Sequence, residues 1–506
     1  MSRNVFRPAT AIALGLASAT AGLVPMSAAA RNVDASAATR NNPRPKNLVV
    51  VMADQWRGEA LGILGREPVR TPNLDRFASM GILFSQCVSA YPVSSPARAM
   101  FMTGAYPLAN GVTANCNSRT APYGVELRGD IRTWSDVLKE KGYATGYIGK
   151  WHLDAPFEPY IDCSNNRGPV AWNEWCPPER RHGFDYWVAY GTYDVHLRPM
   201  YWNNATDRDD WSYVDCWGPE YEAGLAVDYI RQHADEPFAL MVSMNPPHPG
   251  YNQVPERYRE LYADLDADSV AARYPGIDPK QAGSMPRVLR DYYACMSGVD
   301  EQFGRILNEI ERQGLLDNTI VVFTSDHGDM MGVHGLIGKN TFYEEAMRVP
   351  LIIGGGGIEH RQDDELLISL EDFTPTILSL LGYGDDIPAT VQTRDLSAAV
   401  TGRRRVKTDG QLYVKFWAND STRPGGFDGA QPADGWRGWR TARYTYAVRC
   451  VGGEQVDEYL FDRKNDPQQL QNLAATHPRV VQKMRAALRS RLLEIGDPAA
   501  DNLNDK

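Results

Sequence analysis

Four uninterrupted apolar segments, each followed by polar or ionisable residues, constrain the fold of this chain more than any other feature. They span residues 47–53, 144–148, 238–244 and 319–324. The polar residues that follow them are Asp54-Gln55, Lys150 and His152, Asn245 and His248, and Asp326-His327. Continuous apolar runs of this length are typical of strands buried on both faces of a parallel sheet. Because ligands collect at the carboxyl ends of such strands, we expect these polar side chains to meet at one site.

Amphipathic stretches between the apolar runs predict helices over residues 73–80, 133–141 and 288–313. This alternation predicts an α/β fold, with a mostly parallel central sheet flanked by helices. Beyond about residue 400 the pattern changes to short alternating runs rich in aromatic residues at 411–461, followed by a predicted helix at 478–495. We therefore predict a large α/β domain over residues 42–400 and a small C-terminal α+β domain over residues 405–500.

The first 30 residues have the layout of a secretory signal peptide. Arg3 and Arg7 precede a small apolar run over residues 9–24, the segment ends in Ser27 to Ala30, and it has no acidic residue. The apolar run is too short and too rich in alanine and glycine for a membrane span. Without this segment the chain keeps 51 of its 53 basic residues and all 63 acidic ones, a net charge of about −12. We predict an exported protein, periplasmic or secreted, with no membrane span and no nucleic-acid partner.

Seven cysteines are too few and too scattered for a disulfide scaffold, and no CxxC pair suggests a zinc site. Cys163 and Cys176 bracket a loop dense in Asn, Arg, Trp and Pro. In an exported chain we predict these two as the preferred disulfide pair.

A short motif around residue 94 predicts a site for an anion. Ser94 stands two positions before Pro96 and four before Arg98, and Thr103-Gly104 follow. A loop that leads into a helix here would place free N–H groups and a guanidinium around Ser94.

The order Ser-x-Pro-x-Arg with Thr-Gly behind it closely resembles the signature of the formylglycine-dependent sulfatases, in its serine form. The resemblance implies that a maturation enzyme oxidises Ser94 to formylglycine (3-oxoalanine) and that the chain is bacterial. It also implies an alkaline-phosphatase-like fold whose C-terminal domain holds a four-stranded antiparallel sheet. Motif matches extend from about Asn47 to about Ala474.

Asp54 and Asp326 follow buried strands directly and are candidate ligands for a hard divalent cation. Together with the amide oxygen of Gln55, these carboxylates would suit calcium. The string from Thr324 to Gly335, followed by Lys339, resembles the sulfatase segment that supplies the rest of the metal site and a sulfate-binding lysine. The resemblance implies a calcium site formed by Asp54, Gln55, Ser94, Asp326 and His327. Many sulfatases have aspartate in place of Gln55 and asparagine in place of His327, but both side chains of this chain can coordinate a metal.

Further matches imply roles for the other polar residues. Gly149 to His152 resembles a Gly-Lys-x-His element, so Lys150 and His152 would flank the aldehyde and the sulfate. In the implied reaction the formylglycine hydrate attacks sulfur, His248 protonates the leaving alcohol with Lys339 as a possible helper, and His152 is the base that restores the aldehyde. Arg98, Lys150, Lys339 and calcium would neutralise the sulfate charge.

These observations predict a sulfatase, a sulfuric ester hydrolase that removes sulfate from a sulfated mono-, oligo- or polysaccharide. The carbohydrate prediction rests on export and on aromatic loops at residues 186–202 and 436–446. Two alternatives stay open. One is a phosphonate or phosphate monoester hydrolase of the same superfamily, which Gln55 and His327 keep open, and the other is an unmatured, noncatalytic glycan-binding protein. We expect His182, His196 and His334 to be structural.

Overall fold

The computed structural model describes residues 46–266, 269, 277, 285–416 and 432–503. Residues 43–506 form one compact unit. The signal peptide predicted at residues 1–30 lies outside the described residues. Among the described helices, none combines the length and the apolar character needed to cross a membrane.

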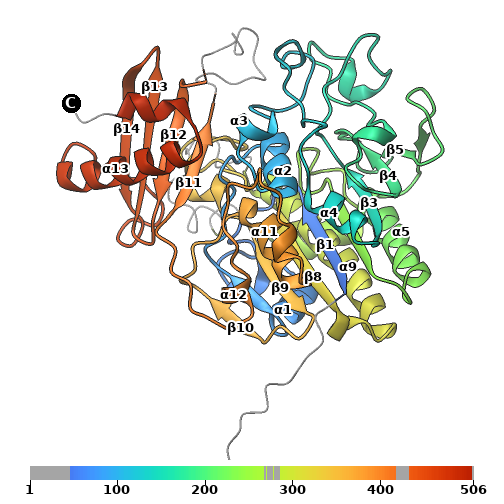
Figure 1. Ribbon diagram of the computed structural model, residues 1–506. Helices are drawn as coiled ribbons and strands as arrows, with labels where there is room; N and C mark the ends of the chain where they lie inside the picture. Colours follow the sequence, from blue (N-terminus) through green and yellow to red (C-terminus); the bar gives the residue numbers. More distant parts are fainter. Residues whose placement is uncertain (1–45, 267–268, 270–276, 278–284, 417–431, 504–506) are drawn as a thin grey trace, which may run out of the picture. The chain divides into compact units, whose positions relative to one another are not determined.

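Within the described residues, ten strands form a large sheet in the order β10-β2-β9-β8-β1-β7-β3-β4-β5-β6. Their bounds are β1 Asn47–Ala53, β2 Ile82–Phe84, β3 Ala144–Lys150, β4 Tyr186–Tyr190, β5 Met200–Asn203, β6 Ser212–Tyr213, β7 Phe238–Met244, β8 Thr319–Ser325, β9 Leu351–Gly355 and β10 Arg361–Asp363. Figure 1 labels β1, β3, β4, β5, β8, β9 and β10 of this sheet. The five central strands, from β8 to β4, are mutually parallel. The four apolar segments of the sequence are β1, β3, β7 and β8, and they lie next to one another in the order β8-β1-β7-β3.

Helices cover both faces of this sheet. Their bounds are α1 Pro72–Ala78, α2 Ser94–Thr103, α3 Pro107–Asn110, α4 Trp134–Glu140, α5 Gly218–Gln232, α6 Glu256–Arg259, α9 Met285–Arg312, α10 Glu344–Met347, α11 Phe373–Leu381, α12 Ser397–Val400 and α13 Pro478–Glu494. In β1, Leu48, Val50 and Met52 join one buried cluster with α2, α4 and α11. Val49 and Val51 point to the opposite face and join α1, α5 and α9. Each strand residue therefore has a helix to pack against, which explains why the strands are apolar throughout.

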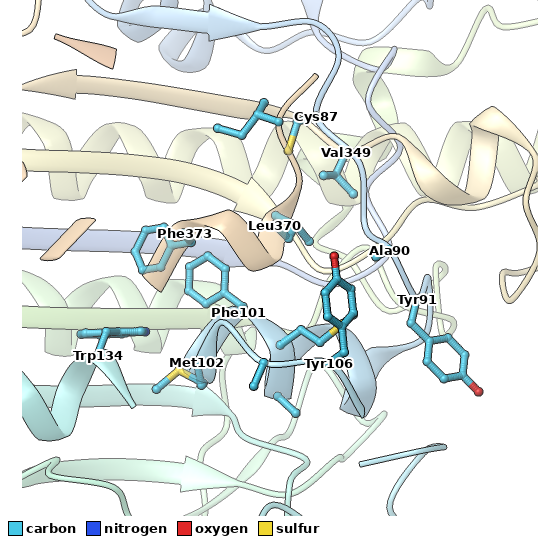
Figure 2. Close-up of a cluster of buried hydrophobic side chains, with 14 of the residues drawn as sticks. Cys87, Ala90, Tyr91, Phe101, Met102, Tyr106, Trp134, Val349, Leu370 and Phe373 are labelled. Atoms are coloured by element: carbon cyan, nitrogen blue, oxygen red, sulfur yellow. The ribbon is translucent and has the colours of Figure 1, made fainter. Parts of the chain in front are cut away.

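Helix α2 is buried along its whole length and is held by aromatic packing (Figure 2). Phe101 stacks on Phe373 of α11 with ring centroids 4.0 Å apart, and Trp134 of α4 meets Phe373 edge-on at 6.0 Å. The helix ends at Gly104, whose φ of 63° lies in the left-handed region that glycine adopts without a steric cost. This packing fixes the position of Ser94, the first residue of α2.

The described C-terminal strands form a separate antiparallel sheet in the order β11-β12-β13-β14. Their bounds are β11 Gln411–Lys415, β12 Gly435–Arg440, β13 Tyr444–Val451 and β14 Glu454–Asp462. Helix α13 packs on this sheet, and Tyr413, Ala447 and Phe461 pack against Phe342 and Met347. The predicted fold class, a mostly parallel sheet with helices plus a four-stranded antiparallel sheet, is confirmed. The domain boundaries at residues 400 and 405 stay predictions.

The predicted disulfide between Cys163 and Cys176 is wrong, because all seven cysteines are free thiols. Cys163 packs with Ile161, Tyr190 and Met200, and its sulfur accepts a hydrogen bond from Asn173. Cys176 belongs to a different buried cluster, and its sulfur donates to the carbonyl of Pro177. The loop between the two cysteines is held by hydrogen bonds instead of a covalent link.

Candidate active site

The register of the parallel strands brings four polar strand ends to one edge of the sheet. Ala53 of β1 pairs with Met244 of β7 on one side and with Ser325 of β8 on the other. Gly149 of β3 pairs with Ser243 of β7. The residues that follow these positions, Asp54, Lys150, Asn245 and Asp326, therefore leave the sheet side by side. The strand ends therefore converge in the structure, as the sequence predicts.

Ser94 lies against this edge, at the N-terminus of α2. Its Oγ is 3.1 Å from Nε2 of His327 and 3.3 Å from Nζ of Lys339. The motif predicts free N–H groups around Ser94. One N–H group of the first helical turn is already bonded, because Ser95 N donates to Oδ1 of Asn115. The site near Ser94 therefore owes its positive charge to side chains more than to the helix terminus.

A buried network of opposite charges surrounds Ser94. Arg98 lies one helical turn after Ser94, and its guanidinium contacts Oδ2 of Asp54 at 3.1 Å and Oδ2 of Asp326 at 3.0 Å. Lys150 Nζ lies 2.7 Å from the same oxygen of Asp54. Lys339 completes the group, with its Nζ 3.9 Å from Oδ1 of Asp54. Arg98, Lys150 and both aspartates are almost fully buried, so these charges act in a medium that screens them poorly.

The two aspartates differ in their protonation behaviour because they share this site. Burial alone would raise the pKa of Asp54, but Lys150, His248, Lys339 and Arg98 hold it well below its usual value. Burial and the charge of Asp54 raise the pKa of Asp326 above its usual value. Two buried carboxylates this close repel each other, and a divalent cation between them would relieve that repulsion.

The ligand atoms of Asp54, Asp326 and His327 fit such a cation. They lie within 4.8 Å of one another. Asp54 Oδ1 is buried and has no hydrogen-bond partner among the described residues, and it lies 3.6 Å from Nε2 of His327. His327 Nδ1 faces the carbonyl of Gly328 at 2.9 Å and donates to it, which leaves the lone pair of Nε2 directed at the carboxylates. A donor set of two carboxylates, an amide and one imidazole suits a hard or borderline divalent cation.

Hydrogen bonds hold the side chain of Gln55, and its amide oxygen faces Lys339. Its Nε2 donates to Oδ2 of Asp329, and its Oε1 accepts from Nζ of Lys339 at 2.8 Å. The backbone of Gln55 has a φ of 72°, which is strained for a residue other than glycine. Two buried contacts hold it there, because Gln55 N donates to Asp326 and the hydroxyl of Tyr292 donates to the Gln55 carbonyl at 2.6 Å.

His152 lies at this end of β3 but makes no hydrogen bond to Ser94. Its Nε2 lies 3.1 Å from the carbonyl of Cys116, and its buried Nδ1 has no partner among the described residues. Burial, together with the charges of Lys150 and Arg98, lowers its pKa well below the usual value. At neutral pH the ring is therefore uncharged, with one nitrogen available to accept a proton.

His248 is linked to the network through residues that sequence reasoning did not assign. Its Nδ1 lies 3.0 Å from Oδ1 of Asp194, and Asn245 connects the same aspartate to Lys150. Asp194 follows strand β4 by four residues, so the rule that polar residues collect at strand ends could have found it. Asp329 follows strand β8 by the same four residues, whereas Asn115 and Tyr292 carry no comparable signal, because they become important only through contacts distant in the chain.

Of the histidines expected to be structural, His182 and His334 are bonded away from this network, whereas His196 lies beside Asp194 and the backbone of His248. His182 pairs with Asp136 of α4, His196 bonds the carbonyl of Pro249, and His334 stacks on Tyr343. Of the large aromatic residues of 186–202, Tyr186 is partly buried and the others, among them Trp187 and Trp202, are buried.

The sequence and the fold together define the class of this protein. The family model described as sulfatase matches residues 46–383, and the model for the C-terminal part of N-sulphoglucosamine sulphohydrolase matches residues 332–497. The chain therefore belongs to the sulfatase family of enzymes, and its fold is alkaline-phosphatase-like.

Individual relatives cover nearly the whole chain. An endo-4-O-sulfatase of Bacteroides thetaiotaomicron is 36% identical, with 89% of this chain and 92% of the relative aligned. An ulvan-active sulfatase of Formosa agariphila is 32% identical, over 90% of this chain and 83% of the relative. A crystal structure from Bacteroides fragilis, described as a sulfatase of the yidJ type, is 51% identical and superposes with a TM-score of 0.87 over 92% of this chain and 98% of its own.

Proposed function

We propose that this sulfatase removes sulfate from a sulfated carbohydrate, with Ser94 converted to formylglycine and calcium bound beside it. One observation carries the proposal. The hydroxyl of Ser94 lies against His327 and Lys339, at the centre of a buried group that holds Asp54, Asp326 and Arg98. A lone serine at a helix start needs no such surroundings.

The charge of the group suits a sulfate ester, which is an anion. Three cationic side chains (Arg98, Lys150 and Lys339) face two carboxylates (Asp54 and Asp326), and a divalent cation would add to the positive surplus. When bound, calcium supplies a fixed charge that polarises the sulfate group. Asp54, Asp326, His327, Gln55 and the group at position 94 are the residues that would hold it. Formylglycine supplies an aldehyde that takes up water, and so offers two hydroxyl groups where serine has one.

Lys339, His152 and His248 are the residues that would orient the reacting groups and transfer protons. Lys339 lies within hydrogen-bond distance of the Ser94 oxygen and would orient the nucleophile and a sulfate oxygen. His152, uncharged and with a free nitrogen, is suited to act as a base. Burial, Lys150 and Lys339 lower the pKa of His248 to about 4 in the free protein. A bound sulfate anion offsets the two lysines and so favours the protonated His248 that the departing alcohol requires.

The carbohydrate substrate is supported by the relatives, since one is named an endo-4-O-sulfatase and another an ulvan-active sulfatase. Sulfated mono-, oligo- and polysaccharides all fit the proposal. We also propose that the chain is exported through its first 30 residues to the periplasm or beyond, and that a formylglycine-generating enzyme matures it.

The test uses protein produced together with a formylglycine-generating enzyme. The peptide that contains Ser94 should be lighter by about 2 Da, the mass of the two hydrogens lost on oxidation. The matured protein should release sulfate from defined sulfated oligosaccharides in the presence of calcium. Faster turnover of aryl phosphonates or phosphate monoesters than of any sulfate ester would overturn the substrate class. An unchanged peptide mass, with glycan binding but no turnover, would instead identify a noncatalytic binding protein.

A further inference from the structure

We propose that Asp194 is the positioning residue of His248, and that it holds the imidazole in the one tautomer that can deliver a proton to the leaving alcohol. This inference rests on the proposed function. It concerns the contact between Asp194, in the loop after β4, and His248, in the loop after β7. No single sequence motif covers both loops.

Three donors converge on the carboxylate of Asp194. His248 Nδ1 lies 3.0 Å from Oδ1, and Asn245 Nδ2 donates to the same oxygen at 3.2 Å. Asn165 Nδ2 donates to Oδ2 at 2.9 Å, while its own Oδ1 accepts from the backbone N–H of Asp194 at 3.1 Å. An ionised carboxylate only accepts hydrogen bonds, so all three contacts are satisfied together.

The electrostatics agree with this geometry. Burial by itself would raise the pKa of Asp194, but the charge of His248 and the hydrogen bond from it hold the pKa far below the usual range. Asp194 is therefore ionised at every pH of interest, and Nδ1 of His248 must carry the proton of their hydrogen bond. The second nitrogen, Nε2, is then the one that can exchange a proton with the substrate.

The proton delivery has a definite balance. As the bond between sulfur and the sugar oxygen breaks, its electron pair stays on the sugar oxygen, and that oxygen takes the proton from Nε2 of His248. The imidazolium becomes neutral imidazole, while Nδ1 keeps its proton and Asp194 stays ionised. The attacking hydroxyl enters this step as its alkoxide, and the SO3 group passes to that oxygen, so one proton moves and the charges on the two sides are equal. Asp194 thus stabilises the imidazolium before transfer and keeps Nε2 as the donor.

The arrangement makes asparagine a poor substitute for Asp194. An amide has one accepting oxygen and one NH2 group, so in Asp194→Asn the NH2 group must face one of the present donors. If it faces Asn165, the contact to Asn165 is lost. If it faces Asn245 and His248, the ring of His248 has to reverse its tautomer. The double variant Asp194→Asn with Asn165→Asp removes this conflict, because the NH2 group then faces a carboxylate at position 165.

The test compares substrates that differ in their need for a proton. Asp194→Asn should lower kcat on a sugar sulfate by about 10- to 100-fold, because it removes part of a general-acid contribution that is itself about 100- to 10,000-fold. On nitrophenyl sulfate, whose leaving group departs without protonation, the loss should be about threefold or less. The double variant with Asn165→Asp should recover most of the activity on the sugar sulfate. Asp162→Asn is the control, since it removes a carboxylate from an exposed pair with Arg167 on the same loop as Asn165.

Two kinetic results would overturn the inference. Equal losses of kcat on both substrates would mean that Asp194 acts only on structure. The same conclusion would follow if the effect of Asp194→Asn on kcat added in full to that of His248→Ala in the double variant. Nitrogen NMR of the histidine rings tests the same idea without turnover. His248 should be the Nδ1–H tautomer in the unaltered protein, and finding the Nε2–H tautomer there would also overturn the inference. Failure of the unaltered protein to hydrolyse any sulfate ester would contradict the proposed function and leave the NMR result to decide on Asp194.

Discussion

Replacing Lys150 by methionine should destabilise the protein measurably, because it removes one partner of a buried ion pair. Lys150 and Asp54 are both fully buried, and Nζ lies 2.7 Å from Oδ2. At an effective dielectric constant near 20, two unit charges at that distance attract by about 6 kcal/mol. Part of this attraction is offset by the desolvation of the lysine, which methionine avoids.

The net cost is smaller than the attraction but still large. Arg98 remains 3.1 Å from the same oxygen of Asp54, so the carboxylate is not left alone. Asn245 loses the donor that its Oδ1 accepts from at 3.1 Å. We expect Lys150→Met to lower the free energy of unfolding by about 3 kcal/mol, the lower end of the range for breaking a buried pair.

Chemical denaturation of the purified chain, followed by fluorescence, measures this change. The control is Lys483→Met on the exposed side of α13, which should leave the midpoint unaltered. A loss below about 1 kcal/mol in Lys150→Met, the value of a surface pair, would refute the reasoning, because Asp54 would then not depend on Lys150 for its charge.

Three further predictions concern the nucleophile, the metal site and a buried glutamate. Ser94→Ala should abolish sulfate release with an unchanged denaturation midpoint, and substantial residual turnover in a sulfate-release assay would contradict the nucleophile assignment. Asp326→Ala should lose bound divalent cation together with activity, and an unchanged metal content by elemental analysis would argue against the site. Glu222 of α5 is buried against Tyr201, and burial raises its pKa to about 8. Between pH 4.5, the ordinary pKa of glutamate, and pH 8, the folded protein therefore keeps a proton that the unfolded chain loses. Stability should therefore fall as the pH rises from about 4.5 to 8, and Glu222→Gln should remove that part of the decline. Parallel pH curves of unfolding free energy for Glu222→Gln and the unaltered protein would show that Glu222 is ionised in the folded state.

Much of the fold followed from local pattern. The apolar segments at residues 47–53 and 238–244 are strands β1 and β7 with the same bounds, because a strand buried on both faces leaves no polar position inside it. Segment 144–148 continues to Lys150, whose buried side chain is paired and so does not end the strand. The C-terminal helix and the four-stranded sheet also lie where alternation predicted them, apart from residues 417–431, which lie outside the described residues.

The candidate site was predicted as a set of residues but not as a set of contacts. Sequence reasoning named Ser94, Asp54, Asp326 and Lys150 from strand ends and motifs. The parallel register brings the last three together, and the packing of α2 places Ser94 beside them. Sequence reasoning predicted Gln55 and His327 as metal ligands. It did not predict the hydrogen bonds to Asp329 and Gly328 that orient their side chains. It also favoured a disulfide at Cys163, from spacing alone, and the thiol is free.

The amino-acid sequence by itself determined which residues are apolar, where the strands end and which chemical groups stand at those ends, because these depend on composition and on a period of a few residues. Tertiary structure alone decided the partners. Lys339 meets Ser94 across 245 positions and Asp194 meets His248 across 54, and nothing local records either pairing. Contacts of that kind exist only after the sheet has assembled, since packing of the helices on its two faces sets the distances between loops that no local preference specifies.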